Sequence, residues 1–384
     1  MDGSTSRIAV VGAGPVGLAL ALHAAQQLPR AQVTLFDARP AELDIGADPR
    51  TLALSLGSVQ LLKRLVRWPA EAAPITEIHV SQQPPGEAVV HLRAADEGVP
   101  MLGAVLSYGR IVAPLQQAWL DAATTEPERL RSRFGTPVAG LKAVAGGVEL
   151  DAGIAEDFDL AVVAEGGVFA EQARKAVAHD YRQTAWVGIV TIEGGSPGTA
   201  FERFTANGPA ALLPLGGARW ALVWCVPGDG DPVRELDDAQ RLALLAQTFP
   251  AEAGRLVALT PLKAFALGLN AERSLVAGRV VRIGNAAQTL HPVAGQGLNL
   301  GLRDAYELVA ALRTRSGIDM ALARVEWARA PDRWATIATT DFLARSFTWR
   351  LPGLAAARGF GLAALDRLPA AKHWLARQMM FGLR

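Results

Sequence analysis

Residues 7–28 read RIAVVGAGPVGLALALHAAQQL, and this stretch decides the fold. A strand over 7–11, rich in β-branched residues, leads into a Gly-x-Gly-x-x-Gly turn, and an apolar helix follows. Gly12 permits the tight turn, Gly14 lets the backbone approach a pyrophosphate, and Gly17 lets the helix pack closely on the strand. The helix N-terminus then supplies an anion site. The residues expected to border that site are Gly12, Gly14, Pro15, Val16 and Gly17.

An acidic residue stands where the same motif requires one. The strand expected over 32–36 ends at Asp37, 25 residues after Gly12, and a carboxylate there can accept hydrogen bonds from a ribose diol. The simpler interpretation is that glycines occur in an ordinary turn and that Asp37 caps a loop. The order of strand, glycine turn, helix and acid favours a dinucleotide site, although the motif alone does not distinguish NAD from FAD.

A second glycine-rich segment lies far along the chain. Residues 279–283 form an expected strand that ends at Gly284, and an amphipathic helix is expected over 298–312. Gly295 and Gly297 free the backbone just before that helix, which again suits a negatively charged group. Two such segments, about 270 residues apart, fit a long ligand that is held at both ends. A nicotinamide dehydrogenase does not need this arrangement.

The composition excludes several classes of protein. The 384 residues, of which 50% are hydrophobic, suffice for two lobes that share one cofactor. The 38 basic and 37 acidic side chains nearly cancel and no basic arm is present, so nucleic-acid binding is not expected. The six histidines show no ligand spacing and Cys225 stands alone, so no metal site is expected. The leader before Ile8 is too short for a signal peptide, so a cytoplasmic protein is expected.

Taken together, the motifs resemble those of a known family. The glycine fingerprint, the Gly284-Asn285 pair and the run HPVAGQGLNLG over 291–301 resemble the class A FAD-dependent aromatic monooxygenases. Within that class the chain is most similar to the ubiquinone-biosynthesis hydroxylases, above all to the 2-octaprenyl-6-methoxyphenol hydroxylase branch. The segments that carry this second likeness are NAAQ at 285–288, RTLALS at 50–55, FERFT at 201–205, LP at 213–214 and LVWC at 222–225.

The resemblance implies where FAD is held. The ADP half would lie on the first glycine turn and Asp37, with Arg50 near the pyrophosphate. Arg110 would contact the flavin, Asn285 would face the flavin-side phosphate or the ribityl chain, and residues 295–299 would border the isoalloxazine ring. The full expected set is Gly12, Gly14, Pro15, Val16, Gly17, Asp37, Arg50, Arg110, Gly284, Asn285, Pro292, Gly295, Gln296, Gly297, Leu298 and Asn299.

His291 is the candidate catalytic residue, because the matching loop of the family lies beside the flavin. The alternative is that a histidine before a proline in a tight turn only holds the backbone. The aromatic residues of the strands near 201–204 and 220–224 can either wall an aromatic site or belong to the ordinary core, since aromatic side chains are common on strands.

The resemblance and the pattern of strands and helices predict an α/β fold. It has an FAD-binding Rossmann-like lobe of the glutathione-reductase type, a mixed β-sheet substrate lobe and a helical C-terminal tail. The FAD lobe is expected in three parts, at 1–70, 101–178 and 272–340. The other expected parts are substrate-sheet strands at 71–100, the substrate-binding β-sheet lobe at 179–271 and a basic amphipathic tail at 341–384.

The resemblance implies an FAD-dependent monooxygenase that hydroxylates the aromatic ring of a polyprenylated phenol in ubiquinone biosynthesis. Reduced flavin would take up O2 as a hydroperoxide, with NADPH or NADH as the reductant. Two alternatives stay open: a flavin dehydrogenase or reductase of an isoprenoid substrate, and a weakly catalytic FAD-binding scaffold of a quinone-biosynthesis complex. One departure favours the scaffold, because the family's Asp-Gly pair appears as Glu165-Gly166 and Phe169 replaces a serine.

The tail over 341–384 is basic and amphipathic. Seven Lys/Arg residues outnumber two acidic ones, and apolar side chains are interleaved with them. Such helices commonly dock on anionic membranes or on partner proteins. Peripheral contact with the inner membrane, and with other quinone-biosynthesis proteins, is therefore expected. The alternative is that the tail merely covers the FAD lobe.

Overall fold

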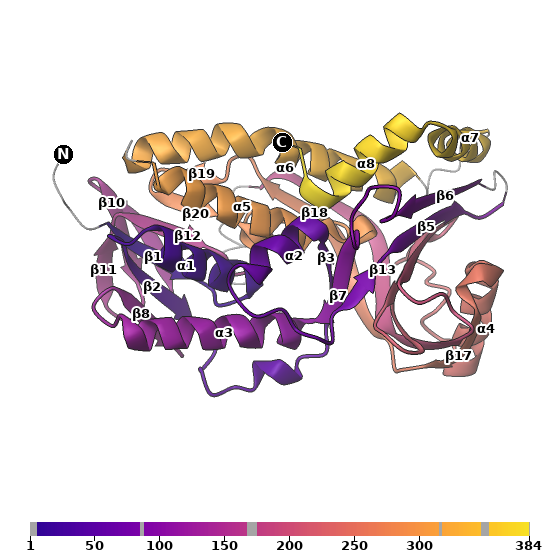
Figure 1. Ribbon diagram of the computed structural model, residues 1–384, viewed down its shortest axis with the longest axis horizontal. Coiled ribbons are helices and arrows are strands. Elements are labelled where there is room, and N and C mark those ends of the chain that lie inside the picture. The colour runs from indigo at the N-terminus through magenta and orange to yellow at the C-terminus, as the bar shows by residue number, and fades with distance from the viewer. Residues whose placement is uncertain (1–5, 85–87, 167–174, 315–316, 347–352, 384) are drawn as a thin grey trace.

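Two lobes lie side by side along the long axis of the protein (Figure 1). The parallel-sheet lobe is built around six strands with helices packed on them, and the large-sheet lobe is built around nine strands and the helix α4 (Asp238–Thr248). The computed structural model describes residues 6–84, 88–166, 175–314, 317–346 and 353–383.

The parallel-sheet lobe has β1 and its glycine turn at the centre. Its strands run in the order β19 (Val276–Ala277), β20 (Val280–Arg282), β12 (Leu160–Val163), β1 (Arg7–Val11), β2 (Gln32–Asp37) and β8 (Leu130–Phe134). All neighbours pair in parallel except β19 and β20. One face packs against α1 (Pro15–Gln27), α3 (Tyr108–Thr125), α5 (Gln296–Leu312) and α6 (Ile318–Ser346), and the other against the meander of β9 (Gly140–Val144), β10 (Gly147–Asp151) and β11 (Ala155–Phe158). Because both faces are buried, β12 is apolar throughout.

The large-sheet lobe is a mixed sheet with α4 on one face. Its strands run in the order β21 (Gln288–Thr289), β18 (Lys263–Glu272), β13 (Lys175–Glu193), β16 (Arg219–Pro227), β15 (Gly208–Pro214), β14 (Thr199–Thr205), β5 (Glu77–Gln82) and β6 (Ala88–Arg93), and β17 (Arg255–Leu259) pairs with β13. Phe201, Trp220 and Trp224 pack on the α4 side with the residues of that helix. These three aromatics therefore belong to the core rather than to a ligand site.

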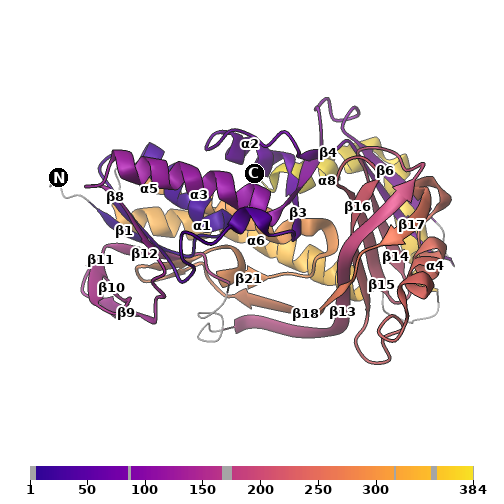
Figure 2. The same cartoon turned by 90° about the horizontal axis from the view of Figure 1, so that it is seen from below.

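Long strands and a small third sheet join the two lobes. β13 and β18 run side by side from the parallel-sheet lobe into the large sheet (Figure 2). The third sheet consists of β3 (Thr51–Ser55), β7 (Gly103–Ser107) and β4 (Ala73–Ile75), and α2 (Leu56–Lys63) follows β3. Because β21 pairs with β18 shortly before α5 begins, the large sheet lies next to the N-terminus of α5.

The tail packs on the body of the protein. α7 (Leu354–Arg367) lies on β6, and α8 (Pro369–Phe381) lies on α2 and β3 (Figure 1). Beyond α8, the Leu383 N–H donates to Asp332 Oδ1 at 2.8 Å, and Gly382 takes a φ of +77°. α8 thus covers α2 and β3, and its Ala376 and Met380 share an apolar cluster with residues of β6. Among the described residues, no helix combines the length and the apolar character that crossing a membrane requires.

The predicted fold class is confirmed, with a Rossmann-like lobe, a mixed-sheet lobe and a helical tail. The predicted boundaries between these parts need correction. Those at 178/179 and 271/272 fall inside β13 and β18, because the two strands pair on both sides of each boundary, with a register shift between Lys175 and Val177. The boundary at 340/341 falls inside α6, which continues to Ser346.

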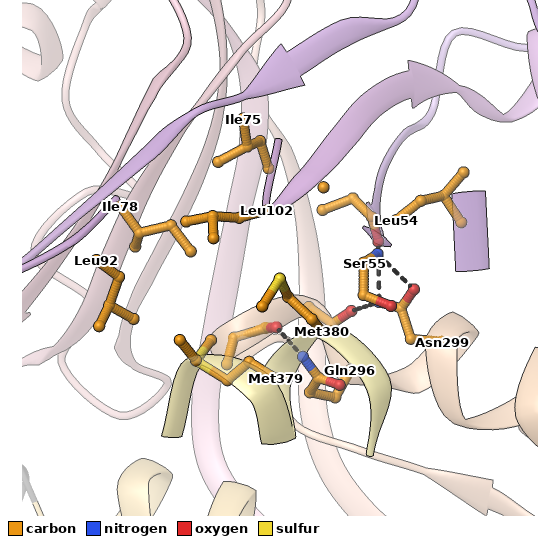
Figure 3. A pocket seen from close by; sticks show the side chains of 15 residues that line it. Leu54, Ser55, Ile75, Ile78, Leu92, Leu102, Gln296, Asn299, Met379 and Met380 are labelled. Carbon is orange, nitrogen blue, oxygen red and sulfur yellow. Dashed lines mark hydrogen bonds between the residues drawn. The ribbon is translucent and has the colours of Figure 1, made fainter. Parts of the chain in front are cut away.

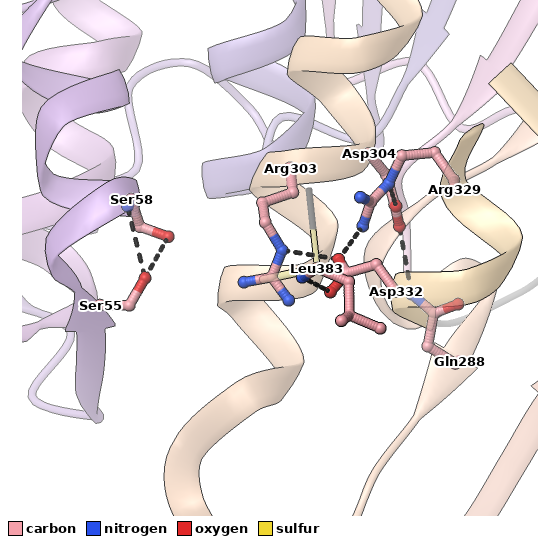
Figure 4. A network of polar contacts seen from close by, with 8 residues as sticks. All are labelled: Ser55, Ser58, Gln288, Arg303, Asp304, Arg329, Asp332 and Leu383. Atoms are coloured by element: carbon pink, nitrogen blue, oxygen red, sulfur yellow. Dashed lines mark hydrogen bonds and ion pairs between the residues drawn. The ribbon is translucent and has the colours of Figure 1, made fainter. Parts of the chain in front are cut away.

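A buried charge network joins α5, α6 and the end of the tail (Figure 4). Arg329 donates from Nε to Asp304 at 2.7 Å and from Nη2 to Asp332 at 2.6 Å. Arg303 donates to the same Asp332 oxygen at 2.9 Å, and Leu383 donates to the other oxygen. The side chain of Asp304 is fully buried and that of Arg329 is 5% exposed. Each charge depends on its partners, because an unpaired charge at this depth is strongly destabilising.

Candidate active site

Each of the three glycines of the first turn is required for a different reason. Gly12 has a φ of +102°, and a Cβ there would lie 2.9 Å from the backbone nitrogen of Glu165. A Cβ on Gly17 would lie 1.9 Å from the Gly12 carbonyl oxygen, so only glycine lets α1 begin this close to β1. At Gly14 a Cβ would meet only the Tyr108 hydroxyl oxygen, at 3.5 Å. Gly14 therefore leaves space at the N-terminus of α1, where a pyrophosphate can bind.

Asp37 ties this turn to the end of β2. One carboxylate oxygen accepts from the Ala13 N–H at 2.5 Å, and the other accepts from the Arg39 N–H at 2.8 Å. Arg39 in turn donates to Gln116 Oε1 at 2.8 Å. The Asp37 side chain remains 16% exposed. It thus stands beside the turn where a ribose would lie, and the hydrogen bond to a ribose stays a prediction.

Tyr108 and Arg50 form a pair next to Gly14. The Arg50 guanidinium lies 4.1 Å from the centre of the Tyr108 ring and forms an ion pair with Asp48 at 2.7 Å. The Arg50 side chain is 63% exposed, so its charge is accessible to a phosphate. Burial raises the pKa of the Tyr108 hydroxyl, which stays protonated and able to donate. No sequence motif singles out Tyr108, and its one signal is its place at the first position of α3.

Arg110 does not lie with Tyr108 and Arg50 next to Gly14. α3 begins at Tyr108, and a step of two residues turns a helical side chain by about 200°, to the opposite side. The exposed Arg110 guanidinium lies 3.7 Å from a Glu71 carboxylate oxygen and borders a small apolar hollow with Trp68. Its contact with the flavin stays a prediction that this geometry does not support.

The second glycine segment meets the first one directly. Gly284 takes a φ of +60°, and a Cβ there would lie 3.3 Å from Val16 of the first turn. A Cβ on Gly301 in α5 would lie 2.8 Å from the Gly284 Cα, so α5 packs against this second turn. A Cβ on Gly166 would lie 3.2 Å from the exposed Asn285. Three segments distant in the sequence therefore border one region between the N-termini of α1 and α5.

Asn299 locks the loop before α5. Its Oδ1 accepts from the Ser55 N–H at 2.8 Å, and its Nδ2 donates to the carbonyls of Gly295 at 2.8 Å and Ala53 at 3.2 Å. Asn299 is 2% exposed, so its amide positions the loop against β3. Gly295 takes a φ of +57°, and a Cβ on Gly297 would meet nothing within 4 Å. The N-terminus of α5 is therefore open to a ligand, as the N-terminus of α1 is.

The residues around this opening are partly accessible, and one of them is strained. Ala294 takes a φ of +62°, which is uncommon for alanine, and such strain is concentrated at functional sites. The Gln296 side chain donates to the Ala294 carbonyl at 3.1 Å. Pro292 and Leu298 flank the same loop. The expected contacts of Pro292, Gln296 and Leu298 with the flavin stay predictions.

His291 is buried and holds the loop in place through both ring nitrogens. Its ring is 1% exposed, its Nδ1 accepts from the Val293 N–H at 3.2 Å, and its Nε2 lies 2.9 Å from Gln183 Oε1. Because Nδ1 accepts, Nε2 carries the proton and donates to Gln183. Burial lowers the pKa of His291 to about 4, so the ring is neutral near pH 7. With both nitrogens engaged, the geometry favours the structural alternative over catalysis.

Acid is expected to destabilise the protein through His291. The folded-state pKa near 4 lies below the ordinary value of 6.5, so the unfolded chain binds a proton that the folded chain rejects. The stabilisation is complete above about pH 6.5 and is lost as the pH falls through 4, to a limit of roughly 3 kcal/mol. Urea unfolding between pH 7 and pH 4 should therefore depend less steeply on pH in His291→Gln than in the wild type. Equal slopes would contradict this assignment.

An apolar cavity of about 470 Å³, counting space open to solvent, lies beside this loop (Figure 3). Its polar side is formed by Ser55, Gln296 and Asn299. Its apolar side is formed by Ile75, Ile78, Leu92, Leu102, Met379 and Met380. The two methionines belong to α8, so the tail forms one wall. This wall could not be predicted from the sequence, because an adjacent pair of methionines forms no recognisable motif.

The residues present fit FAD. Two helix N-termini are left open at Gly14 and Gly297, the two glycine segments touch each other, and an apolar cavity adjoins the second segment. The open helix N-termini suit the pyrophosphate, the contact between the glycine segments suits an extended linker, and the apolar cavity suits a flat ring. Within the described parts of the chain, no group of three or more histidine, cysteine or acidic residues is arranged to hold a metal ion.

Comparisons with known sequences agree with this interpretation. Residues 167–317 match the family model described as an FAD binding domain. The chain is 31% identical to ubiquinone hydroxylase UbiL of Rhodospirillum rubrum, in an alignment that covers 100% of this chain and 92% of that protein. It is 30% identical to the 3-demethoxyubiquinol 3-hydroxylase of Escherichia coli, over 96% of each chain.

Solved structures share the fold. Klebsiella pneumoniae HpxO, solved with FAD and uric acid, superposes with a TM-score of 0.73 at 17% identity, over 98% of this chain and 97% of that one. The p-nitrophenol 4-monooxygenase PnpA of Pseudomonas putida superposes with a TM-score of 0.73 at 15% identity, over 100% of both chains. Since two sequence relatives at 30% identity or above align over nearly its whole length, the chain belongs to the family of FAD-dependent monooxygenases that contains the hydroxylases of ubiquinone biosynthesis.

Proposed function

We propose that the protein hydroxylates the aromatic ring of a polyprenylated phenol in ubiquinone biosynthesis, with O2 as co-substrate and NADPH or NADH as reductant. The observation that carries the substrate class is the cavity beside Gln296, whose walls are leucine, isoleucine and methionine side chains. An aromatic ring that bears an isoprenoid chain is an apolar ligand suited to such walls. The ubiquinone-pathway relatives support the choice of pathway.

The chain's own residues would hold the cofactor at both ends. The open helix N-terminus at Gly14 and the exposed Arg50 would bind the pyrophosphate, with Asp37 at the ribose. Asn285 would face the linker, and Gly297 would let the backbone approach the ring. FAD, when bound, supplies the transfer of electrons and the activation of oxygen.

The remaining task of the protein is to orient the substrate ring and to exclude water. Asn299 fixes the loop on one side of the cavity through Ser55 and Gly295. Met379 and Met380 of α8 close the other side. Methionine side chains adapt their shape to a flexible ligand, and an isoprenoid chain is one.

Oxygen labelling tests the proposal. The purified FAD-loaded protein would be given NADPH or NADH, a short-chain prenylated phenol and ¹⁸O2. A monooxygenase adds one ¹⁸O atom to the product, which mass spectrometry detects. A dehydrogenase or reductase gives a product without ¹⁸O. A scaffold, the alternative that the Glu165-Gly166 departure favours, binds FAD but oxidises no reductant in response to the phenol.

We also propose that the tail brings the enzyme to an anionic membrane surface. Among the described residues that follow α6, three large apolar side chains are well exposed: Phe360 (76%), Leu368 (56%) and Trp374 (61%). Exposed cations accompany them, with Arg367 next to Leu368 and Arg377 one turn from Trp374. Apolar and aromatic residues beside basic ones suit the boundary between lipid headgroups and acyl chains.

The double variant Phe360→Ser/Trp374→Ser is expected to sediment less with phosphatidylglycerol-containing vesicles than the wild type does. High salt should weaken the wild-type binding further, because it screens the basic residues. Ile154→Ser is the control, since Ile154 is 70% exposed in the turn between β10 and β11 at the far end of the molecule (Figure 1). Its sedimentation should match the wild type. FAD content should stay the same in all three proteins, and equal sedimentation of all three would refute the proposal.

A further inference from the structure

One face of the large sheet looks toward the parallel-sheet lobe, and we call it the inner face. Residues paired directly across neighbouring strands share a face, so Glu202 of β14 lies together with Val80 of β5 and Ala211 of β15. Phe204, two residues along β14, packs against Val293 just before the N-terminus of α5. The inner face therefore meets the loop that borders the expected flavin position.

The centre of the inner face is partly accessible. The opposite face of the same strands is buried beneath α4, through residues such as Phe201 and Leu212. Val80, Glu202 and Ala211 stay partly accessible, although β14 lies between β15 and β5 in the interior of the sheet. Packed side chains therefore cover these residues only in part, and Val80 contacts the cluster of Phe204 and Val293. Ile78, two residues before Val80 on the same face of β5, lines the cavity beside Gln296.

Glu202 is the carboxylic acid at this centre. Its paired neighbours are apolar, and within the described part of the chain no hydrogen bond or ion pair engages its carboxylate. Among the described inner-face residues of β5, β15 and β16, two are titratable: Arg219 at the exposed start of β16, and Cys225, whose thiol is kept protonated because burial and Glu202 both raise its pKa. An enclosed acid without a partner costs folding free energy, and such groups are concentrated where function requires them.

We propose that Glu202 is a catalytic residue that accepts the phenolic proton of the aromatic substrate. The phenol O–H bond breaks, its electron pair stays on the oxygen, and the proton forms a new O–H bond on the carboxylate. The resulting phenolate donates electron density into the ring, which makes the ring carbon more reactive toward an electrophilic oxygen. This inference rests on the proposed function, because it requires a phenolic substrate.

The surroundings of Glu202 suit that task. Enclosure in an apolar region raises the pKa of its carboxyl to about 8, whereas an ordinary phenol has a pKa of about 10. A carboxylate of ordinary pKa would be a much weaker base, so the raised value brings donor and acceptor closer together. The base must be ionised before it accepts a proton. Hydroxylation should therefore increase as the pH rises through about 8.

The test compares FAD-loaded wild type with Glu202→Gln, with 2-prenylphenol as the probe. Single-turnover hydroxylation in Glu202→Gln is expected to fall by on the order of 100-fold, the usual contribution of a general base. The rising limb through pH 8 should disappear, and the rate should recover toward pH 10, where the phenol ionises without help. The ultraviolet difference spectrum at pH 8.5 should show bound phenolate in the wild type and bound phenol in the variant.

Glu193→Gln is the matched control, because Glu193 is an exposed acid on β13 whose ion pair with Arg255 lies on the surface. It should keep the rate, the pH profile and the phenolate spectrum of the wild type. If Glu202→Gln also keeps all three, the assignment is overturned. If the wild type binds phenolate without hydroxylating it, the proposed function fails while the proton-accepting role of Glu202 stands.

Discussion

Gly14→Val is expected to give a folded protein that no longer retains FAD. The backbone at Gly14 has a φ of −77° and a ψ of −177°, which valine adopts without strain. A Cβ would lie 3.5 Å from the Tyr108 hydroxyl, an ordinary contact, so the apoprotein tolerates the change. The valine side chain would instead fill the space that the pyrophosphate needs. The dissociation constant for FAD should increase at least on the order of 100-fold, or by about 2.7 kcal/mol.

Titration of the apoprotein with FAD, followed by quenching of flavin fluorescence, measures this loss, and circular dichroism checks the fold. Gly140→Val is the matched control, because a Cβ at Gly140 on β9 would meet nothing within 4 Å and lies outside the glycine segments. It should bind FAD as the wild type does. A Gly14→Val protein that is purified with stoichiometric FAD would show that the pyrophosphate lies elsewhere.

Arg329→Met is expected to be among the most destabilising single substitutions. Methionine keeps most of the side-chain volume but removes the charge that pairs with Asp304 and Asp332. Asp304 then remains fully buried, and within the described part of the chain the Gln288 amide at 3.4 Å is its only remaining side-chain donor. Removal of one partner from a buried ion pair typically costs about 3–5 kcal/mol. The free energy of unfolding, measured with urea, should decrease by that amount.

Arg255→Met provides the comparison. Arg255 pairs with Glu193, but the two side chains are 74% and 57% exposed, and exposed pairs contribute about 0–1 kcal/mol. Its free energy of unfolding should therefore stay within about 1 kcal/mol of the wild type. The interpretation of the network would be wrong if Arg329→Met proved as stable as Arg255→Met.

Features that depend on local geometry could be predicted from the sequence. The strand over 7–11 and the helix after it follow from Gly12 and Gly17, because no other residues allow a strand and a helix to approach so closely. The start of α4 is local in the same way, since the carboxylate of its N-cap residue Asp237 accepts from the Gln240 N–H at 2.8 Å. The second glycine segment could be placed before α5 for the same reason.

Features that depend on the direction of a side chain could not be predicted from the sequence. Tyr108 and Arg110 both lie at the start of α3, and only the rotation of the helix decides which one meets Gly14. β14 carries an aromatic residue on each face, Phe201 on one and Phe204 on the other. The alternation of residue types along the strand therefore does not reveal that Glu202 lies on the inner face. A basic amphipathic helix suits a membrane and a protein surface equally well, so the sequence does not decide whether α8 packs on the protein or binds a membrane.

The strand order of the parallel sheet has a consequence for the synthesis of the protein. β12 lies between β1 and β20, yet β20 begins at Val280, long after β12 ends at Val163. At about 5–20 residues per second, the ribosome needs roughly 6–25 s to make the intervening chain. During that time one edge of β12 has no partner, and unpaired edges promote aggregation. Production of the enzyme should therefore be sensitive to chaperones and to growth temperature. FAD can be bound at both of its ends only after α5 has left the ribosome.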